Sequence, residues 1–516
     1  MRRFGVALSS ILRDAKLRLA PQDEVRDAKF CFAPREEVRD ARLRLTPLKE
    51  DGDFGARQRG RGHALIAPLS LAVLIALLSD SAATAADSAP MVSPDRIEDA
   101  PSIKPDPYPD FDNFAWRAFI ALNWPSLTDP AHRGVPDRAK TLGDSGPRVW
   151  ETFKARYELF QVGPDGRPVA PKPWATYEAA NPCGAGVDNR EKTLATFTPF
   201  MDFNQSAFLA GVGANPLVAQ NRTYTRYEGR LNEPEYSALA VHGWSQGQNL
   251  PDPAYPADLP MGSIAVKAAW RPLNAADTPA MRARYYVVED ANVVDVAKTL
   301  AAGRTVCSKS DVALVGLHIV IRTKDRPQGL WGTFEHVDNV PPAGEGEARE
   351  PDARQAGAPY SYFDASKPKL GLWPTFGLPD TLPVSVDHPP KLDPTPMQVV
   401  RRHPIHASTI ALNRAYWALP GIKGTEWEHY MLVASQWPTI PAPASPQNDG
   451  GYFPGQPLTA DAPRENYQSA DAPKENLVNT TIETYFQDAP SSCMSCHQSL
   501  SNALGRDFVG MLGSFR

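Results

Sequence analysis

The alternation of apolar and polar residues predicts a body built mainly from β-strands. Short runs rich in Val, Ile, Tyr and Phe recur through the middle of the chain, and Gly and Pro stand in the intervals between them. We expect strands at 262–270, 284–288, 312–321, 332–337 and 428–436. The run at 312–321 (VALVGLHIVI) is apolar on both faces, so this strand is expected to be central and buried.

Helical patterns are shorter and lie near the start of the body. A helix is expected at 111–122, where Phe114, Trp116 and Phe119 recur at helical spacing and Pro125 follows. A second short helical stretch is expected at 149–159. The pattern as a whole predicts an α+β fold in which a β-rich main body at 111–395 carries short peripheral helices. Long proline-rich loops are expected at 341–359, 438–457 and 459–476.

The N-terminal residues are expected to lie outside the working protein. A charge-free run of 15 residues at 64–78 follows Arg57, Arg59 and Arg61 and precedes a small-residue Ala-Thr-Ala site, which is typical of a secretory signal over 64–85. The run is short for a membrane span, although an uncleaved anchor is the alternative. Residues 1–63 repeat with a period of 13 and are interpreted either as an extension upstream of the true start or as a charged amphipathic arm. Residues 86–110 are expected to form a flexible lead-in.

Charge and cysteine content change once residues 1–85 are set aside. The remaining 431 residues hold 39 Lys and Arg against 48 Asp and Glu, a net charge of −9, which argues against nucleic acid as a partner. Four cysteines remain. Two of them, Cys183 and Cys307, are far apart in sequence and can either pair, as an oxidising compartment would permit, or stay free.

The other two cysteines belong to a C-x-x-C-H motif at Cys493, Cys496 and His497. Thiols at this spacing add to the two vinyl groups of a haem, and the following histidine supplies the proximal nitrogen to its iron. A capping box with Thr480 as cap and Glu483 three residues later predicts a helix at 482–487 that leads into the motif. We therefore expect one covalent haem c, held by a C-terminal region at 396–516.

Three other uses of a C-x-x-C pair fit less well. A zinc site needs four ligands, and no second Cys or His pair lies close in sequence. A thioredoxin-like pair follows a strand near the front of a βαβ unit, whereas this pair lies 20 residues from the end of the sequence. A plain disulfide between cysteines so close would be strained and leaves His497 without a role.

The chain resembles a group of large bacterial periplasmic monohaem c-type cytochromes. The resemblance rests on VGLHIV at 315–320, TFEHVDN at 333–339, SQWP at 435–438 and the NTTIETY and SSCMSCH pieces between 479 and 497. The function of this group is poorly defined, so the resemblance implies a haem and export but names no substrate. It also implies a periplasmic location, with no stable membrane span after cleavage of the signal.

The sequence alone does not identify the second protein ligand of the haem iron. His336 is the candidate distal metal ligand, since it shares one side of its strand with Phe334 and has Asp338 near enough to orient a ring nitrogen. His318, between Leu317 and Ile319, is interpreted as a buried histidine held by hydrogen bonds. The remaining candidates are His403, His406, His429, Met431 and Met511, and a five-coordinate iron is the alternative.

The coordination of the haem iron distinguishes the candidate functions. Two protein ligands imply electron transfer to or from a redox protein partner, whereas an open iron implies a peroxidase or oxygenase, and a haem-bearing binding or sensor module is the third possibility. Catalytic residues other than the haem ligands are not identified. Aromatic and acidic residues near the predicted site are interpreted as packing or as solvated surface, namely Trp331, Trp427, Trp437, Glu335, Asp338, Glu426 and Glu428.

Overall fold

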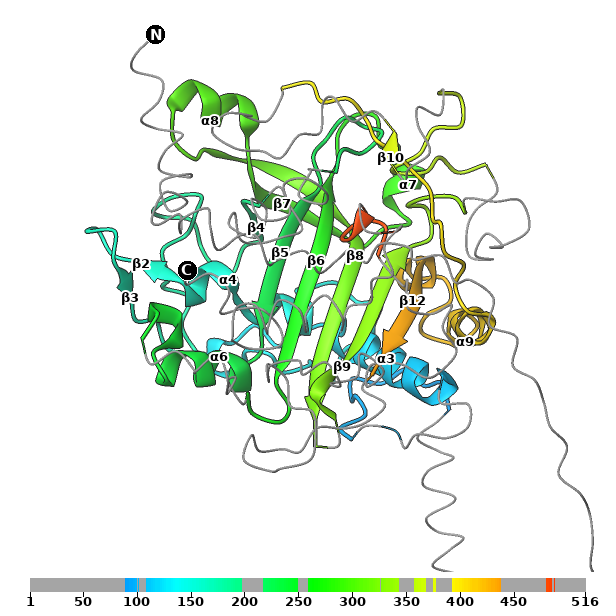
Figure 1. The fold of residues 1–516 in the computed structure, drawn as a ribbon, viewed down its shortest axis with the longest axis horizontal. Helices are drawn as coiled ribbons and strands as arrows, with labels where there is room; N and C mark the ends of the chain where they lie inside the picture. The colour runs from blue at the N-terminus through cyan, green and yellow to red at the C-terminus, as the bar shows by residue number, and fades with distance from the viewer. Residues whose placement is uncertain are drawn as a thin grey trace, which may run out of the picture.

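The fold is centred on one eight-stranded, largely antiparallel sheet (Figure 1). It comes from a computed structural model that describes residues 89–99, 101, 108–196, 217–248, 259–324, 326–342, 357–367, 375–376, 392–437, 479–484 and 487. The strand order is β1-β5-β6-β8-β7-β4, with β9 paired to β8 and β12 paired to β9. The bounds are β1 Lys154–Ala155, β4 Thr193–Leu194, β5 Arg226–Leu231, β6 Ile264–Pro272, β7 Val287–Val294, β8 Cys307–Thr323, β9 Arg326–His336 and β12 Tyr430–Gln436. The expected α+β class with a β-rich body is confirmed.

Strand β8 is the centre of the sheet, as its double-sided apolar pattern predicts. Along one edge, residues 312–321 of this 17-residue strand pair with β6, while the other edge is shared by β7 in the first half and β9 in the second half. Every residue from Val312 to Thr323 is buried. Covering both faces of this strand removes apolar area from water, which is the main favourable contribution to folding.

Helix α3 (Tyr108–Leu122) covers one face of the sheet, which we call the helix face (Figure 1). The helix is buried on nearly all sides because α9 (Ala407–Trp417) packs against its outer surface. Trp116 stacks on Tyr416 with ring centroids 4.6 Å apart, and its Nε1 donates to Asn413 Oδ1 at 2.8 Å. The helix expected at 111–122 is confirmed and begins three residues earlier.

Other elements were predicted less well. The helical stretch expected at 149–159 is divided into η4 (Val149–Thr152) and α4 (Arg156–Leu159) by strand β1. Helix α9 and α6 (Glu233–Val241) were not predicted. The remaining short elements are η3 Pro130–His132, β2 Gln161–Val162, β3 Pro168–Val169, η5 Trp244–Gln246, α7 Pro279–Arg282, α8 Val296–Ala302, β10 Thr375–Phe376, β11 Gln398–Val399 and η7 Glu426–His429.

The predicted boundaries correspond to the structure only in part. Residues 1–63 and the signal at 64–85 lie outside the described residues. Within the expected flexible lead-in, Val92 and Ile97 pack against the main core and Asp95 pairs with Arg138. The expected boundary at 395/396 separates no folded unit, because α9 and β12 complete the core and the sheet of the body. In the part of the chain that the structure describes, no helix is long and apolar enough to cross a membrane.

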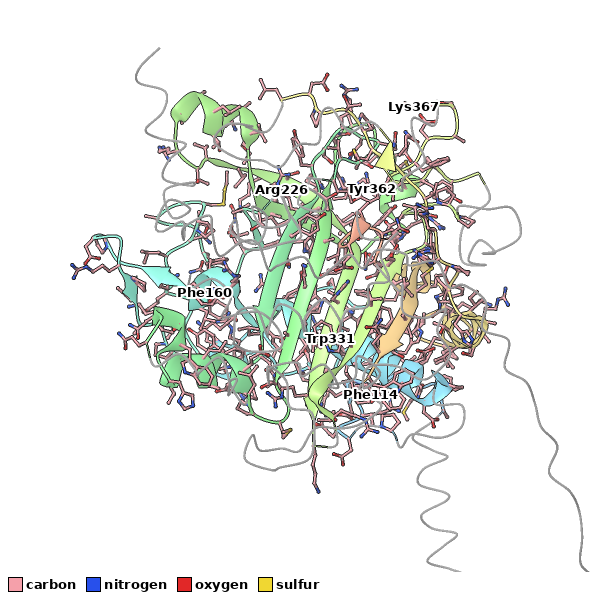
Figure 2. All side chains as sticks on the ribbon, viewed as in Figure 1. Phe114, Phe160, Arg226, Trp331, Tyr362 and Lys367 are labelled. Atoms are coloured by element: carbon pink, nitrogen blue, oxygen red, sulfur yellow. A yellow bond between two sulfur atoms is a disulfide. The ribbon has the colours of Figure 1, made fainter. Side chains whose placement is uncertain are left out.

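A disulfide joins Cys183 to Cys307, the first residue of β8, with their Cα atoms 5.4 Å apart (Figure 2). It attaches the loop before β4 to the start of the central strand. The two cysteines are 124 residues apart in sequence, so the bond closes a long loop. The pairing that the sequence leaves open is therefore made.

Candidate functional site

The residues that lead into the C-x-x-C-H motif lie on the sheet face opposite α3. Cys493, Cys496 and His497 themselves fall outside the described residues, as does Met511. The part of this region that the structure describes, residues 479–484 and 487, we call the docked segment; Figure 1 shows its first part in front of β8. Ile482 packs into a second apolar cluster together with Tyr227, Ala269 and Val315. We call this side of the sheet the docking face.

Strand β9 provides the first set of contacts for the docked segment. Asn479 Nδ2 donates to Thr333 Oγ1 at 3.1 Å and to the Phe334 carbonyl at 2.9 Å. The backbone N–H of Thr480 donates to Glu335 Oε1 at 2.6 Å, and the Thr480 hydroxyl donates to the other carboxylate oxygen. Thr333 and Glu335 point to the docking face because side chains alternate along a strand. All these groups are buried, so the contacts exclude water.

Glu335 is the charged centre of this contact. Its carboxylate is fully buried and also accepts a hydrogen bond from Arg401 Nη2 at 2.6 Å. The expectation that Glu335 is solvated is wrong, and so is the one for Asp338, which is buried and pairs with Arg284 at 2.6 Å. In both cases an arginine compensates the carboxylate, buried Arg401 for Glu335 and the partly buried Arg284 for Asp338, which sequence spacing alone does not reveal.

Strands β5 and β8 complete the docking contact. The Tyr227 hydroxyl donates to the Thr481 carbonyl at 2.9 Å. A Cβ atom on Gly316 would lie 2.3 Å from Thr481 Oγ1, which is closer than real Cβ contacts come. Glycine at position 316 therefore permits the close approach of the docked segment to the sheet.

The predicted capping box exists but is shifted by one residue. Asn479, not Thr480, is the cap: its Oδ1 accepts from the Thr481 N–H at 2.9 Å, and Glu483 Oε2 accepts from the Asn479 N–H at 3.1 Å. Residues 480–482 form a turn, Glu483 a bend, and Thr484 has the geometry of a 3-10 helix, while residues 485 and 486 of the helix expected at 482–487 lie outside the described residues. The Thr480 hydroxyl cannot cap because it binds Glu335.

Gln487 is anchored to the strand β11 region. Its Nε2 donates to the Val400 carbonyl at 3.0 Å, and its Oε1 accepts from the Arg402 N–H at 3.0 Å. The carbonyl of Gln487 accepts from His403 Nε2. Cys493 follows Gln487 by six residues, so the motif begins within roughly 20 Å of an anchored residue.

His336, the predicted distal ligand, lies in a closed environment. Its Nδ1 accepts from the Asp338 N–H at 3.1 Å, so Nε2 carries the proton and donates to the Arg284 carbonyl at 2.9 Å. Tyr285 stacks on the ring with centroids 3.7 Å apart, and Tyr430 meets it edge-on at 5.1 Å. Both nitrogens are engaged, so iron binding would require one of these bonds to break. His336 as an iron ligand stays a prediction that this geometry does not favour.

The same environment predicts a strong pH dependence of stability. Burial lowers the pKa of His336 to about 3, from an ordinary value near 6.5. The unfolded chain therefore takes up a proton between those two values that the folded chain does not, and stability is lost as the pH falls through this window. We expect His336 alone to reduce the free energy of unfolding by about 2 kcal/mol between pH 7 and pH 5. Urea titrations of wild type and His336→Gln at both pH values measure this change in the free energy of unfolding. The exposed His132→Gln is the control, and an equal pH dependence in wild type and His336→Gln contradicts the assignment.

The other sequence candidates have structural partners. His406 Nδ1 contacts Ser408 Oγ at 2.6 Å, and His429 lies in η7 beside Glu428. The strand expected at 428–436 begins at Tyr430, so His429 and Met431 do not share a strand face, and Met431 is buried in the main core. Trp427 stacks on Tyr286 at 5.1 Å and Trp437 stacks on Phe111 at 4.1 Å. Trp331 and Phe114, labelled in Figure 2, line a small apolar pocket between α3 and the sheet.

Two acidic candidates remain near the surface. Glu426 is partly exposed and faces Arg148 at 3.4 Å, while burial raises the pKa of its carboxyl. Glu428 is also partly exposed and accepts from the Gly424 N–H at 2.6 Å. Among the described residues, no group of three or more His, Cys, Asp or Glu side chains could hold a metal ion.

No family model, curated protein or solved structure matches this chain.

Proposed function

We propose that the chain is an exported c-type cytochrome that carries one covalent haem and passes single electrons to or from a partner oxidoreductase. The observation that carries the proposal is the anchoring of residues 479–484 and 487, the last of which precedes the first cysteine of the C-x-x-C-H motif by six positions in sequence. A haem attached at Cys493 and Cys496 would then be held close to the body of the protein rather than on a free tail. The resemblance to large monohaem cytochromes agrees with this proposal.

The fit of a haem rests on the chemistry of the donor set in the C-x-x-C-H motif, two thiols and an imidazole. On the docking face, the buried His318 is paired within the chain, because its Nε2 lies 3.2 Å from Glu483 Oε2. A bound haem supplies an iron that cycles between ferric and ferrous states. The residues Cys493, Cys496 and His497 would hold it.

The disulfide supports export. Disulfides persist in oxidising compartments such as the bacterial periplasm, and c-type haem attachment needs free thiols at the motif. The structure pairs Cys183 with Cys307, so the two cysteines of the motif remain for the haem once the leader is removed. A periplasmic location also agrees with the signal expected at 64–85.

The experiment is expression with the c-haem assembly machinery, followed by a pyridine haemochrome spectrum. We expect one c-type haem per chain, and its complete loss in Cys493→Ala/Cys496→Ala. Cys183→Ser/Cys307→Ser is the matched control, which removes two cysteines and keeps the haem. A wild-type protein without covalent haem contradicts the proposal. A haem whose ferrous form binds carbon monoxide at once would redirect it to an enzyme with an open iron site.

A further inference from the structure

Tyr286, the residue before β7, donates a hydrogen bond from its phenol to a buried carboxylate in the core of the helix face. Its Oη lies 2.5 Å from Glu151 Oε2 in η4, and only 7% of the tyrosine is exposed. The same Glu151 oxygen accepts from the Arg148 N–H at 2.9 Å, while Oε1 lies 2.8 Å from Lys192 Nζ. A hydroxyl–carboxylate contact of this length is a charge-assisted hydrogen bond, so a proton acceptor already lies in place beside the phenol.

The surroundings of Tyr286 oppose both a free phenolate and a positively charged ring. Burial, together with the negative charge of Glu151, raises the pKa of Tyr286 well above its ordinary value, so the phenol is protonated. The Arg148 guanidinium lies over the ring, 4.7 Å from its centroid. A fixed positive charge at that distance disfavours a second positive charge on the ring. Loss of an electron from this ring is therefore favoured only when the phenolic proton leaves with it.

Glu151 is ionised and can take up this proton. Burial raises the pKa of its carboxyl, but the charge of Lys192 and the hydrogen bonds to the carboxylate more than offset this, so the pKa lies below its ordinary value. Lys192 Nζ also lies 2.5 Å from Glu228 Oε1, and both of these side chains are buried. Protonation of Glu151 therefore does not leave this buried cation without a charged partner.

Other aromatic rings connect Tyr286 to the rest of this core. Trp427 stacks on Tyr286 with ring centroids 5.1 Å apart, and Trp427 in turn lies 5.5 Å from Tyr430. By a second route, Trp270 lies 6.2 Å from Tyr286 and 6.0 Å from Trp150. Single electrons pass readily between aromatic rings in near contact. An oxidising equivalent that reaches any of these rings can therefore move to Tyr286.

Tyr286 differs from these neighbours in the partner of its proton. Tyr430 and Trp427 donate to backbone carbonyls at 2.8 and 3.1 Å, and a carbonyl is too weak a base to hold the proton. Trp270 Nε1 donates to Glu228, but two cations already compensate that carboxylate. Tyr286 is thus the ring of this group at which an electron and a proton can leave together.

We propose that Tyr286 is a redox-active tyrosine, which is oxidised to its neutral radical while its phenolic proton moves to Glu151. The O–H bond of Tyr286 breaks and a new O–H bond forms at Glu151 Oε2. One electron passes through the neighbouring rings to an outer-sphere one-electron oxidant, which is reduced by that electron. Return of an electron and of the proton restores the pair. This activity goes beyond the proposed function, because it belongs to the core of the body and does not use a haem.

The test is photo-oxidation of the full chain by tris(bipyridine)ruthenium(III), an outer-sphere one-electron oxidant that is generated by light. Transient absorption follows the radical, and electron paramagnetic resonance of frozen samples identifies it. Wild type is expected to form a neutral tyrosyl radical, more slowly in deuterium oxide than in water because the O–H bond breaks in the same step. Tyr286→Phe is expected to lose this radical. Glu151→Gln keeps an acceptor oxygen but cannot hold the proton, so it should lose the radical as well.

Tyr362→Phe is the matched control. Tyr362 is also fully buried, but its hydroxyl contacts the Thr225 hydroxyl at 2.8 Å rather than a carboxylate, so this variant should keep the wild-type radical. Urea unfolding shows that each variant is folded, and Tyr286→Phe decides the test if Glu151→Gln does not fold. A wild-type yield of radical in Tyr286→Phe, or a rate that deuterium oxide does not change, overturns the proposal. Neither outcome bears on the covalent haem, which the pyridine haemochrome measures separately.

Discussion

Replacing both disulfide cysteines, as Cys183→Ser/Cys307→Ser, is expected to lower the free energy of unfolding by about 4–5 kcal/mol. The two cysteines are 124 residues apart in sequence, so the bond closes a long loop in the unfolded chain. In the chain-entropy model, removal of the bond raises the conformational entropy of the unfolded chain, which lowers the free energy of unfolding by this amount. Both cysteines are only partly buried, with Cys183 in a loop and Cys307 at the start of β8, so the replacement leaves the cores intact. Urea unfolding followed by tryptophan fluorescence measures the change, because the chain has 11 tryptophans.

Wild type under reducing conditions is the control for this prediction. It should lose as much stability as the double variant, whereas the variant itself should be insensitive to reductant. Equal stability of the oxidised wild type and the variant would mean that the bond contributes nothing. A small loss accompanied by disorder near Cys183 would instead locate the effect in the loop alone.

The sheet could be predicted from sequence because its strands carry their own signal. The run at 312–321 is apolar on both faces, and only a central strand buries both faces. Boundaries were less certain where polar residues continue a strand: β7 starts at Val287 and includes Glu289 and Asp290, which a strand pattern does not favour. Helix α9 was missed because its buried side chains include Asn413 and Thr409, which are polar and find partners only in the tertiary structure.

The site was predictable only in its covalent chemistry. The C-x-x-C-H spacing points to haem attachment without any knowledge of the fold. The contacts between the docking face and the docked segment depend on pairs far apart in sequence, such as Glu335 with Thr480 and Arg401. No local sequence pattern contains such pairs. The sequence of β9 does contain part of the information, because Thr333 and Glu335 alternate with the apolar Phe334. The two polar side chains therefore lie on the opposite face of the sheet from Phe334, where they need polar partners.

Glu335→Gln is expected to weaken the docking of residues 479–484 by about 3–5 kcal/mol. The substitution removes a buried negative charge and leaves Arg401 as an uncompensated buried cation, which is the costly way to break a buried pair. It also exchanges an acceptor for an NH₂ group opposite the Thr480 N–H or hydroxyl. Hydrogen exchange of the backbone amides of Thr480 and Thr481 should therefore accelerate, and proteases should cleave before the motif more readily. Both are measured on the full chain.

Two further variants separate charge from docking. Glu335→Gln/Arg401→Gln removes the uncompensated charge, so it should recover part of the stability while the amides of the docked segment stay unprotected. Gly316→Ala keeps the Glu335 charge but places a Cβ atom 2.3 Å from the Thr481 Oγ1 position, so it should release the same amides by a steric route. The exposed Asp165→Asn, from a surface ion pair with Arg167, should change stability by less than about 1 kcal/mol. If Glu335→Gln behaves like Asp165→Asn, the docked segment is not held by this carboxylate, and the anchoring on which the haem proposal depends loses its main contact.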